Sequence, residues 1–142
     1  MVQEFPVYMQ KKNKVFIIAE AGVNHNNDFI LAKKLIKEAK RCGADAVKFQ
    51  AFKTENYIVK KAPLAGYQKK NTNYSNQFNL IKELELSGSK LKQLMIYAKK
   101  IKINFLASAF DIWGINFLHK NKINIFKIPS GEITNYPYLK YI

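Results

Sequence analysis

Val15-Phe16-Ile17-Ile18-Ala19 is the stretch that decides the fold, and the segments after it repeat its pattern. A short, continuous apolar run of this kind predicts a strand covered on both faces, as in a parallel sheet. After a polar turn, Asp28 is placed to cap a helix whose apolar residues recur at helical spacing: Leu31, Ala32, Leu35, Ile36 and Ala39. Gly43 is placed to end that helix, and Ala44 to Gln50 predict a second buried strand.

The alternation of strand and helix continues to the end of the chain. A helix is predicted from about Ser89 to Ile101, and a third strand from Ile103 to Ser108. Asp111 is placed to cap the next helix, and a fourth strand is predicted from Ile123 to Ile128, with the final residues beginning another helix. Because right-handed crossovers place successive strands side by side, this order predicts one parallel sheet.

The predicted fold class is therefore α/β, and specifically the N-terminal half of a TIM (β/α)8 barrel with parallel strands. Such a barrel needs about eight strand and helix units and about 250 residues, whereas this sequence has 142. We expect one truncated domain over residues 1–142, without the second half of the barrel. An open sheet of this kind leaves an unpaired edge and an uncovered apolar face, so we expect poor solubility or self-association.

Composition and charge exclude several classes of protein. Hydrophobic residues make up 48% of the chain, enough for one core, and no apolar stretch reaches the roughly 18 to 20 residues that cross a bilayer. The first fourteen residues lack the apolar core of a signal peptide, which predicts a cytoplasmic protein. One cysteine and two histidines predict neither a disulfide nor a zinc cluster. The formal charge of +14 is spread over every segment, so neither nucleic acid nor a membrane is an expected partner.

Polar residues interrupt the apolar strands near their predicted C-terminal ends. They are Glu20, Lys48, Gln50, Ser108, Lys127, Ser130 and Glu132. In β/α barrels this end of the sheet carries the active site, so we expect these side chains to meet in one mouth. A lysine inside a strand is costly to bury unless a carboxylate or an anionic ligand compensates it. Two interpretations stay open, a structural pair such as Lys48 with Glu20, and an anionic ligand held by the lysines.

The connection from Ala51 to about Gly88 is far longer than the usual ~2 to 6 residues of such units. It contains a predicted short helix from Asn76 to Leu86. Long connections of this kind commonly cover or line active sites, and ordinary surface insertions can be equally long. The side chains in it that could meet a polar or acidic ligand are Lys60, Lys61, Tyr67, Gln68 and Lys69.

Three motifs occur in a fixed order along the chain. They are Ile17-Ile18-Ala19-Glu20-Ala21-Gly22-Val23-Asn24-His25-Asn26, Ala46-Val47-Lys48-Phe49-Gln50, and Phe126-Lys127-Ile128-Pro129-Ser130-Gly131-Glu132-Ile133-Thr134-Asn135. Together they resemble the sialic-acid synthase family, over essentially the whole chain from about Val15 onward. The Phe-Gln pair after Lys48 and the Pro-Ser-Gly-Glu-Ile-Thr-Asn run are most similar to the legionaminic-acid synthase branch.

The resemblance implies a condensation of phosphoenolpyruvate with an N-acetylated amino sugar, such as N-acetylmannosamine or its 2,4-diacetamido-6-deoxy counterpart. The products would be a nine-carbon ulosonic acid, sialic or legionaminic, and phosphate. Members of the family use a divalent metal, Mn2+ or Mg2+, held by histidines of later strands that this chain lacks. They also carry a C-terminal antifreeze-like domain, which closes over the sugar in a homodimer. His25 is expected to be a structural residue of its turn rather than a metal ligand.

The resemblance also assigns roles to individual residues. Lys48 and Lys127 match the positions that neutralise the phosphate and carboxylate of the donor, and Ser130 with the backbone of Gly131 would bind the phosphate. Glu20 and Glu132 are the expected catalytic residues, which orient the sugar or a water molecule and could transfer a proton.

The remaining substrate-binding residues that we predict are Gln50, Ser108, Phe110, Tyr67 and Gln68. Ser108 and Phe110 match a Thr-Pro-Phe element of the family. Ala109 replaces the proline of that element and leaves the local backbone less constrained.

Two other functions remain open. One is a Schiff-base aldolase, in which Lys127 or Lys48 attacks a keto acid as an amine. The other is a catalytically dead fragment that associates with a partner chain through its exposed sheet edge. We expect the isolated chain to be inactive, because the metal ligands would lie elsewhere.

Overall fold

The computed structural model describes residues 15–123 and 125–142. The first fourteen residues, used above only to consider a signal peptide, lie outside the described part. Strands and helices alternate along the chain as follows: β1 (Ile18–Gly22), α1 (Phe29–Arg41), β2 (Ala46–Ala51), α2 (Thr54–Tyr57), α3 (Gly66–Asn71), α4 (Gln77–Leu84), α5 (Gly88–Lys100), β3 (Asn104–Ala109), α6 (Ile112–Lys120), a 3-10 turn (Ser130–Glu132) and α7 (Tyr136–Tyr141). No helix in the described part is long and apolar enough to span a membrane.

The three strands form one parallel sheet in the order β1-β2-β3. The register places Glu20 beside Lys48 and Gln50 beside Ser108. An irregularity between Glu20 and Gly22 ends the regular pairing of β1 with β2. This sheet confirms the predicted parallel α/β architecture for the first three strands.

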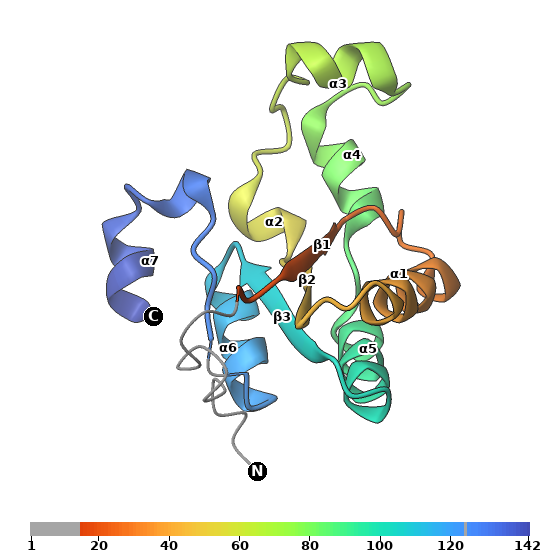
Figure 1. The fold of residues 1–142 in the computed structure, drawn as a ribbon. Helices are drawn as coiled ribbons and strands as arrows, with labels where there is room; N and C mark the ends of the chain where they lie inside the picture. The colour runs from red at the N-terminus through yellow and green to blue at the C-terminus, as the bar shows by residue number, and fades with distance from the viewer. Residues whose placement is uncertain (1–14, 124) are drawn as a thin grey trace.

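Helices cover one face of this sheet and create the core. α1 and α5 lie beside one another against it, and α6 packs along β3 (Figure 1). The sheet residues that point toward these helices are apolar and buried: Val47, Phe49, Ala51, Phe105, Ala107 and Ala109. Leu91 and Leu94 of α5 and Ile36 of α1 are fully buried against them. Burial of this apolar area is the main stabilising contribution to the fold.

The predicted helix caps are confirmed. The Asp28 carboxylate accepts hydrogen bonds from the N–H groups of Ile30 and Leu31 at the start of α1. Asp111 accepts from the N–H of Gly114 at 2.7 Å at the start of α6. Gly43 follows the end of α1 with a φ of 80°, in the left-handed region that favours glycine.

The first strand differs from the prediction. β1 begins at Ile18 rather than Val15 and includes Glu20. Val15, Ile17 and Ile18 have 79%, 55% and 42% of their surface exposed, so the expected cover on both faces is absent. The reason is the position of β1 at the edge of the sheet, where only β2 pairs with it among the described residues. An apolar sequence shows that a strand can be covered, but not which element covers it.

The predicted fourth strand, Ile123 to Ile128, is wrong for the described residues. Its residue Asn124 lies outside the described part, and the remaining residues form no ladder with β3. Phe126 and Ile128 nevertheless pack against the core. Pro129 follows directly and has no N–H to extend a ladder. These apolar side chains therefore belong to the core, although their segment forms no strand ladder.

The long connection after β2 folds into α2, α3 and α4. The predicted helix from Asn76 to Leu86 is α4, with Asn76 as its N-cap. Figure 1 shows α3 and α4 projecting above the edge of the sheet where β2 ends. This is the edge at which barrel enzymes bind their substrates.

Candidate functional site

The face of the sheet opposite the helices is polar at the C-terminal ends of the strands. Glu20 and Lys48 are paired in register, as are Gln50 and Ser108. Side chains two residues apart point to the same face of a strand, so Lys48 and Gln50 lie together. The structure therefore brings together four of the predicted site residues, from β1, β2 and β3.

Lys48 is the centre of this group. Its ammonium forms an ion pair with Glu20 Oε2 and lies 3.5 Å from Ser108 Oγ. The Lys48 side chain is 12% exposed, whereas that of Glu20 is 49% exposed. The structural pair that the sequence left open is thus present. It is asymmetric, because the cation is withdrawn into the protein and the anion faces solvent.

Gly22 leaves room for the side chains of Glu20 and Gln50 beside the end of β1. A Cβ atom at Gly22 would lie 3.2 Å from Glu20 Oε1 and 3.9 Å from Gln50 Nε2. Its φ of 52° is also one that side-chain-bearing residues rarely adopt. The glycine after β1 therefore lets the Glu20 carboxylate and the Gln50 amide approach the same point.

An aromatic cluster stands beside the ends of β2 and β3. Phe110 contacts Phe52 edge to face, with ring centroids 6.2 Å apart, and lies 5.6 Å from the Tyr57 ring. Burial raises the pKa of Tyr57 well above its ordinary value, and the carboxylates of Asp111 and Glu85 add to this. The Tyr57 hydroxyl is therefore a neutral hydrogen-bonding group at physiological pH.

Two buried carboxylates hold the turn after β2, a role that the sequence reasoning missed. Glu85 accepts hydrogen bonds from Lys53 Nζ at 2.6 Å, from Thr54 N–H at 3.0 Å and from Thr54 Oγ1 at 3.1 Å. Asp111 accepts from the Lys53 N–H at 3.2 Å and from the Asn56 amide. The one available signal was the position of Glu85, between Leu84 and the buried Leu86 at a helix end.

Glu85 is strongly stabilised in its charged form. Burial alone would raise its pKa, but hydrogen bonds from Lys53, Thr54 and Lys82 outweigh burial and lower the pKa to about 2. Its side chain is only 7% exposed. The Glu85 carboxylate thus connects the residue after α4 with the residues just after β2, which are the two ends of the long connection.

Within the described residues, no hydrogen bond or ion pair joins the other predicted site residues to this group. Lys127 is exposed, and it has no hydrogen bond or ion pair with Glu20, Gln50 or Ser108 within the described residues. Ser130 and Gly131 are also exposed, and Glu132 accepts a hydrogen bond from the Asn135 amide at 2.6 Å. The expected convergence of the Lys48 and Lys127 ammonium groups stays a prediction.

Tyr67 and Gln68 lie in α3, far along the projecting connection. Tyr67 is 70% exposed. Gln68 is buried, and its Oε1 accepts a hydrogen bond from the Ala65 N–H at 2.8 Å, which caps α3. Gln68 therefore has a structural task in this chain.

The described residues do not fit a metal centre. No group of three or more His, Cys, Asp or Glu side chains lies close enough to hold a metal ion in residues 15–123 and 125–142. His25 is 1% exposed, stacks on Phe49 and accepts a hydrogen bond from the Asn27 N–H through Nδ1. Burial, and then the charge of Lys90, lower its pKa. The structural role expected for His25 is confirmed.

The sequence of this chain is similar to those of known proteins. A model of the NeuB family matches residues 35–142. The chain is 53% identical over 130 residues to the N,N'-diacetyllegionaminic acid synthase of Campylobacter jejuni, covering 91% of this chain and 39% of that protein. It is 40% identical to the N-acetylneuraminate-9-phosphate synthase of Mus musculus, covering 91% and 36%.

A solved structure gives the same result for the fold. The N-acetylneuraminic acid synthetase of Leptospira borgpetersenii, crystallised with citrate, superposes with a TM-score of 0.73 at 34% identity. The match covers 90% of this chain and 40% of that one. The chain thus spans about two fifths or less of the length of these relatives, and its three parallel strands correspond to part of a TIM barrel.

Proposed function

Because the chain belongs to the NeuB family, we propose that its strand-end group binds phosphoenolpyruvate for condensation with an N-acetylated amino sugar. The products would be a nine-carbon ulosonic acid and phosphate. The observation that carries the proposal is the placement of Lys48, Gln50, Ser108 and Glu20 on one face of three neighbouring strands. That face and that end are where a barrel enzyme holds its substrate.

We assign Lys48 to the binding of phosphoenolpyruvate, the donor substrate. Phosphoenolpyruvate carries a phosphate and a carboxylate, and a fixed ammonium in a partly desolvated site binds such anions strongly. In the free chain the Lys48 ammonium is paired with the Glu20 carboxylate, but half of the Glu20 side chain already faces water. Moving Glu20 aside therefore costs little desolvation, and the Ser108 hydroxyl 3.5 Å from Lys48 Nζ can donate to the same anion.

Glu20 and Gln50 are the groups that we assign to the sugar. Both approach the point beside Gly22, where a hydroxyl or acetamido group would find an acceptor and a donor. A displaced Glu20 carboxylate would face the reacting atoms and could move a proton. The 53% identity with a diacetyllegionaminic acid synthase supports a 2,4-diacetamido-6-deoxy sugar over N-acetylmannosamine.

The segment of residues 125–132 would complete the donor site. Phe126 and Ile128 pack against the core, so alternation directs Lys127 to the opposite face, which is the face of Lys48. On that face Lys127 would bind the anion together with Ser130, Gly131 and Glu132 of the turn that follows. The described residues do not fit the divalent Mn2+ or Mg2+ that the family implies.

Features of a complete family member also remain proposals. They are the further barrel strands, the C-terminal antifreeze-like domain and the homodimer. A Schiff-base aldolase would form a covalent lysine adduct with pyruvate, which borohydride traps. Absence of that adduct is the expected result.

Binding of phosphoenolpyruvate to this chain tests the proposal. We expect Lys48→Met to weaken binding by at least tenfold at low salt, measured by calorimetry, because it removes the ammonium. Ser108→Ala should weaken binding by roughly threefold, as expected for one neutral hydrogen bond. Lys99→Met on the exposed side of α5 is the matched control and should change little. Equal loss in Lys48→Met and Lys99→Met, or no binding by the unaltered chain, would contradict the proposal.

A further inference from the structure

A buried hydroxyl group connects helix α7 to the end of β3. Tyr138 is 3% exposed, and its hydroxyl donates a hydrogen bond of 2.8 Å to the backbone oxygen of Ala109. Ala109 is the last residue of β3 and follows Ser108, which belongs to the strand-end group. The hydroxyl therefore joins α7 to the strand end at which we place the donor.

Asn135 connects the same helix to the 3-10 turn at Ser130–Glu132. Its side-chain NH2 group donates to Glu132 Oε2 at 2.6 Å, and its backbone N–H donates to the Glu132 backbone oxygen at 3.1 Å. Its Oδ1 accepts from the Tyr138 N–H at 3.3 Å and caps α7. These contacts link the Ala109 carbonyl to the Glu132 carboxylate through Tyr138 and Asn135.

The Tyr138 hydroxyl stays a hydrogen-bond donor at physiological pH. Burial, and then the carboxylates of Glu132 and Asp111, raise its pKa to about 12. The Tyr138 ring packs in the apolar core, a task that a phenylalanine ring of nearly the same volume would also perform. What the hydroxyl adds is direction, because a hydrogen bond requires a particular distance and angle to one acceptor.

The turn at Ser130–Glu132 needs such a contact because the segment before it has no strand ladder. Phe126 and Ile128 pack against the core, but residues 125–128 pair with no strand in the described part of the chain. Apolar burial holds a segment near the core without setting its direction. The hydrogen bonds from α7 supply the orientation that a ladder would otherwise give.

We propose that Tyr138 is a positioning residue, which holds the Ser130–Glu132 turn at the end of β3 and makes no contact with a substrate. The turn and Lys127 before it carry groups that we assign to the phosphoenolpyruvate anion, so the inference rests on the proposed function. Loss of one hydroxyl outside the site should therefore loosen the turn and weaken binding through Lys127 and its neighbours.

Exchange of backbone amide hydrogens in the complete chain, followed by NMR, tests this role directly. The N–H groups of Glu132 and Ile133 close the turn. Tyr138→Phe should speed their exchange by about threefold or more. The reference is the amide of Phe49 in the buried strand β2, which reports on global unfolding.

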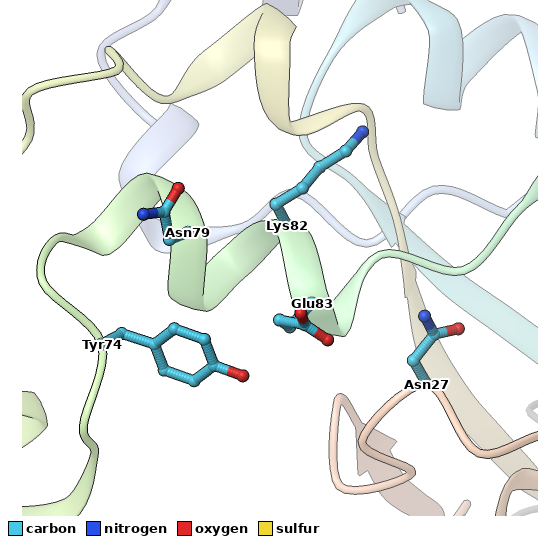
Figure 2. Close-up of a pocket in the computed structure, with 5 residues that line it drawn as sticks. All are labelled: Asn27, Tyr74, Asn79, Lys82 and Glu83. Atoms are coloured by element: carbon cyan, nitrogen blue, oxygen red, sulfur yellow. The ribbon is translucent and has the colours of Figure 1, made fainter.

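Two tyrosines provide matched controls, because each can lose a hydroxyl outside this contact. Tyr141 also lies in α7, but its hydroxyl donates to Asn116 Oδ1 of α6 at 3.0 Å in an exposed bond. Tyr74 lines a polar recess beside α4, and no residue of α7 lies among the five that line it (Figure 2). Tyr141→Phe and Tyr74→Phe should leave the turn amides unchanged.

Asn135→Asp is a second variant, at an exposed position that leaves the buried ring untouched. It keeps the oxygen that caps α7 but loses the NH2 group that donates to Glu132, and it places a second negative charge there. The turn amides should again exchange faster.

Phosphoenolpyruvate binding distinguishes positioning from a general loss of stability. Tyr138→Phe should raise the dissociation constant about threefold in the otherwise unaltered chain, but less than about 1.5-fold in a Lys127→Met background. The reason is that the group being positioned is absent from the second background. A merely structural loss would act equally in both.

The inference fails if the turn amides exchange at the original rate in both Tyr138→Phe and Asn135→Asp. It also fails if Tyr141→Phe has as large an effect as Tyr138→Phe, or if binding is weakened equally with and without Lys127. If the unaltered chain binds no phosphoenolpyruvate while the turn amides respond as expected, the proposed function fails and the positioning of the turn by Tyr138 stands.

Discussion

The two faces of the same three strands are built on different principles. Toward the helices, Val47, Phe49 and Ala51 alternate with the residues that point the other way, and at most 1% of each is exposed. Toward the open side, Glu20, Lys48 and Gln50 form a polar group that still reaches solvent. Close packing of apolar side chains stabilises the first face, whereas an ion pair and hydrogen bonds organise the second. Changes on the first should therefore alter stability, and changes on the second should alter binding.

Phe49→Ala should have the largest effect on stability. Phe49 is fully buried and stacks on Phe105 at 5.3 Å and on His25 at 5.9 Å. Truncation of a buried phenylalanine typically costs about 3 to 5 kcal/mol. Urea unfolding followed by circular dichroism measures it, with Phe49→Leu as a milder variant. Similar losses from Phe49→Ala and from Gln50→Ala would break the comparison between the faces.

Glu85→Gln should come next, at about 1 to 3 kcal/mol, because it weakens a buried and multiply bonded carboxylate. The pKa of Glu85 falls from an ordinary 4.5 to about 2 in the fold. Its contribution to stability is therefore complete above about pH 4.5 and is lost as the pH falls toward 2. Urea unfolding between pH 6 and 3 should show a flatter profile in Glu85→Gln, whereas exposed Glu38→Gln should keep the original slope.

The free energy of unfolding should also depend on the protonation of His25, with a smaller effect than that of Glu85 and at higher pH. Burial lowers its pKa, so the folded chain holds the neutral imidazole while the unfolded chain binds a proton near its ordinary value of 6.5. The contribution of the neutral His25 to stability is fully present above pH 6.5 and is lost as the pH falls from there toward the lowered pKa. Unfolding of His25→Gln at pH 7.5 and 5.5 should show less difference than the original chain. An identical difference would contradict the assignment.

Lys48→Met should have the smallest effect on stability, within about 1 kcal/mol. Replacing one partner of an ion pair by an apolar side chain of similar length is often close to neutral when the other partner, here Glu20, reaches water. The same variant should lose phosphoenolpyruvate binding. A large loss of stability would show that the polar face is structural, and would remove the distinction between the two faces.

Much of the fold was predictable because its signals are local. Asp28, Gly43 and Asp111 mark helix ends through bonds to residues a few positions away, and the predicted caps are confirmed. The strand around Lys48 was also predicted, because it repeats the short apolar run of the first strand. The start of β1 and the segment 123–128 were wrong in detail, because strand limits depend on a pairing partner.

The candidate site was predicted in part, because the order of the strands implies which strand ends lie together. Glu20, Lys48 and Ser108 meet because parallel strands end at a common edge, which the order of strands implies. Lys127 carried a similar signal, but its segment pairs with no strand among the described residues, so its place in the site stays a prediction. Glu85 was missed because its bonds reach Lys53 and Thr54, more than thirty residues earlier, and no local pattern marks them.

The sequence by itself determined the alternation of strands and helices, the helix caps and the polar strand ends, because periodicity and capping depend on neighbours within one or two turns. Only the tertiary structure decided that Lys48 pairs with Glu20, that Glu85 closes the long connection, and which strand face stays open. Those outcomes require atoms from distant segments to come within hydrogen-bond distance. That distance depends on register and packing, which no single stretch of sequence contains.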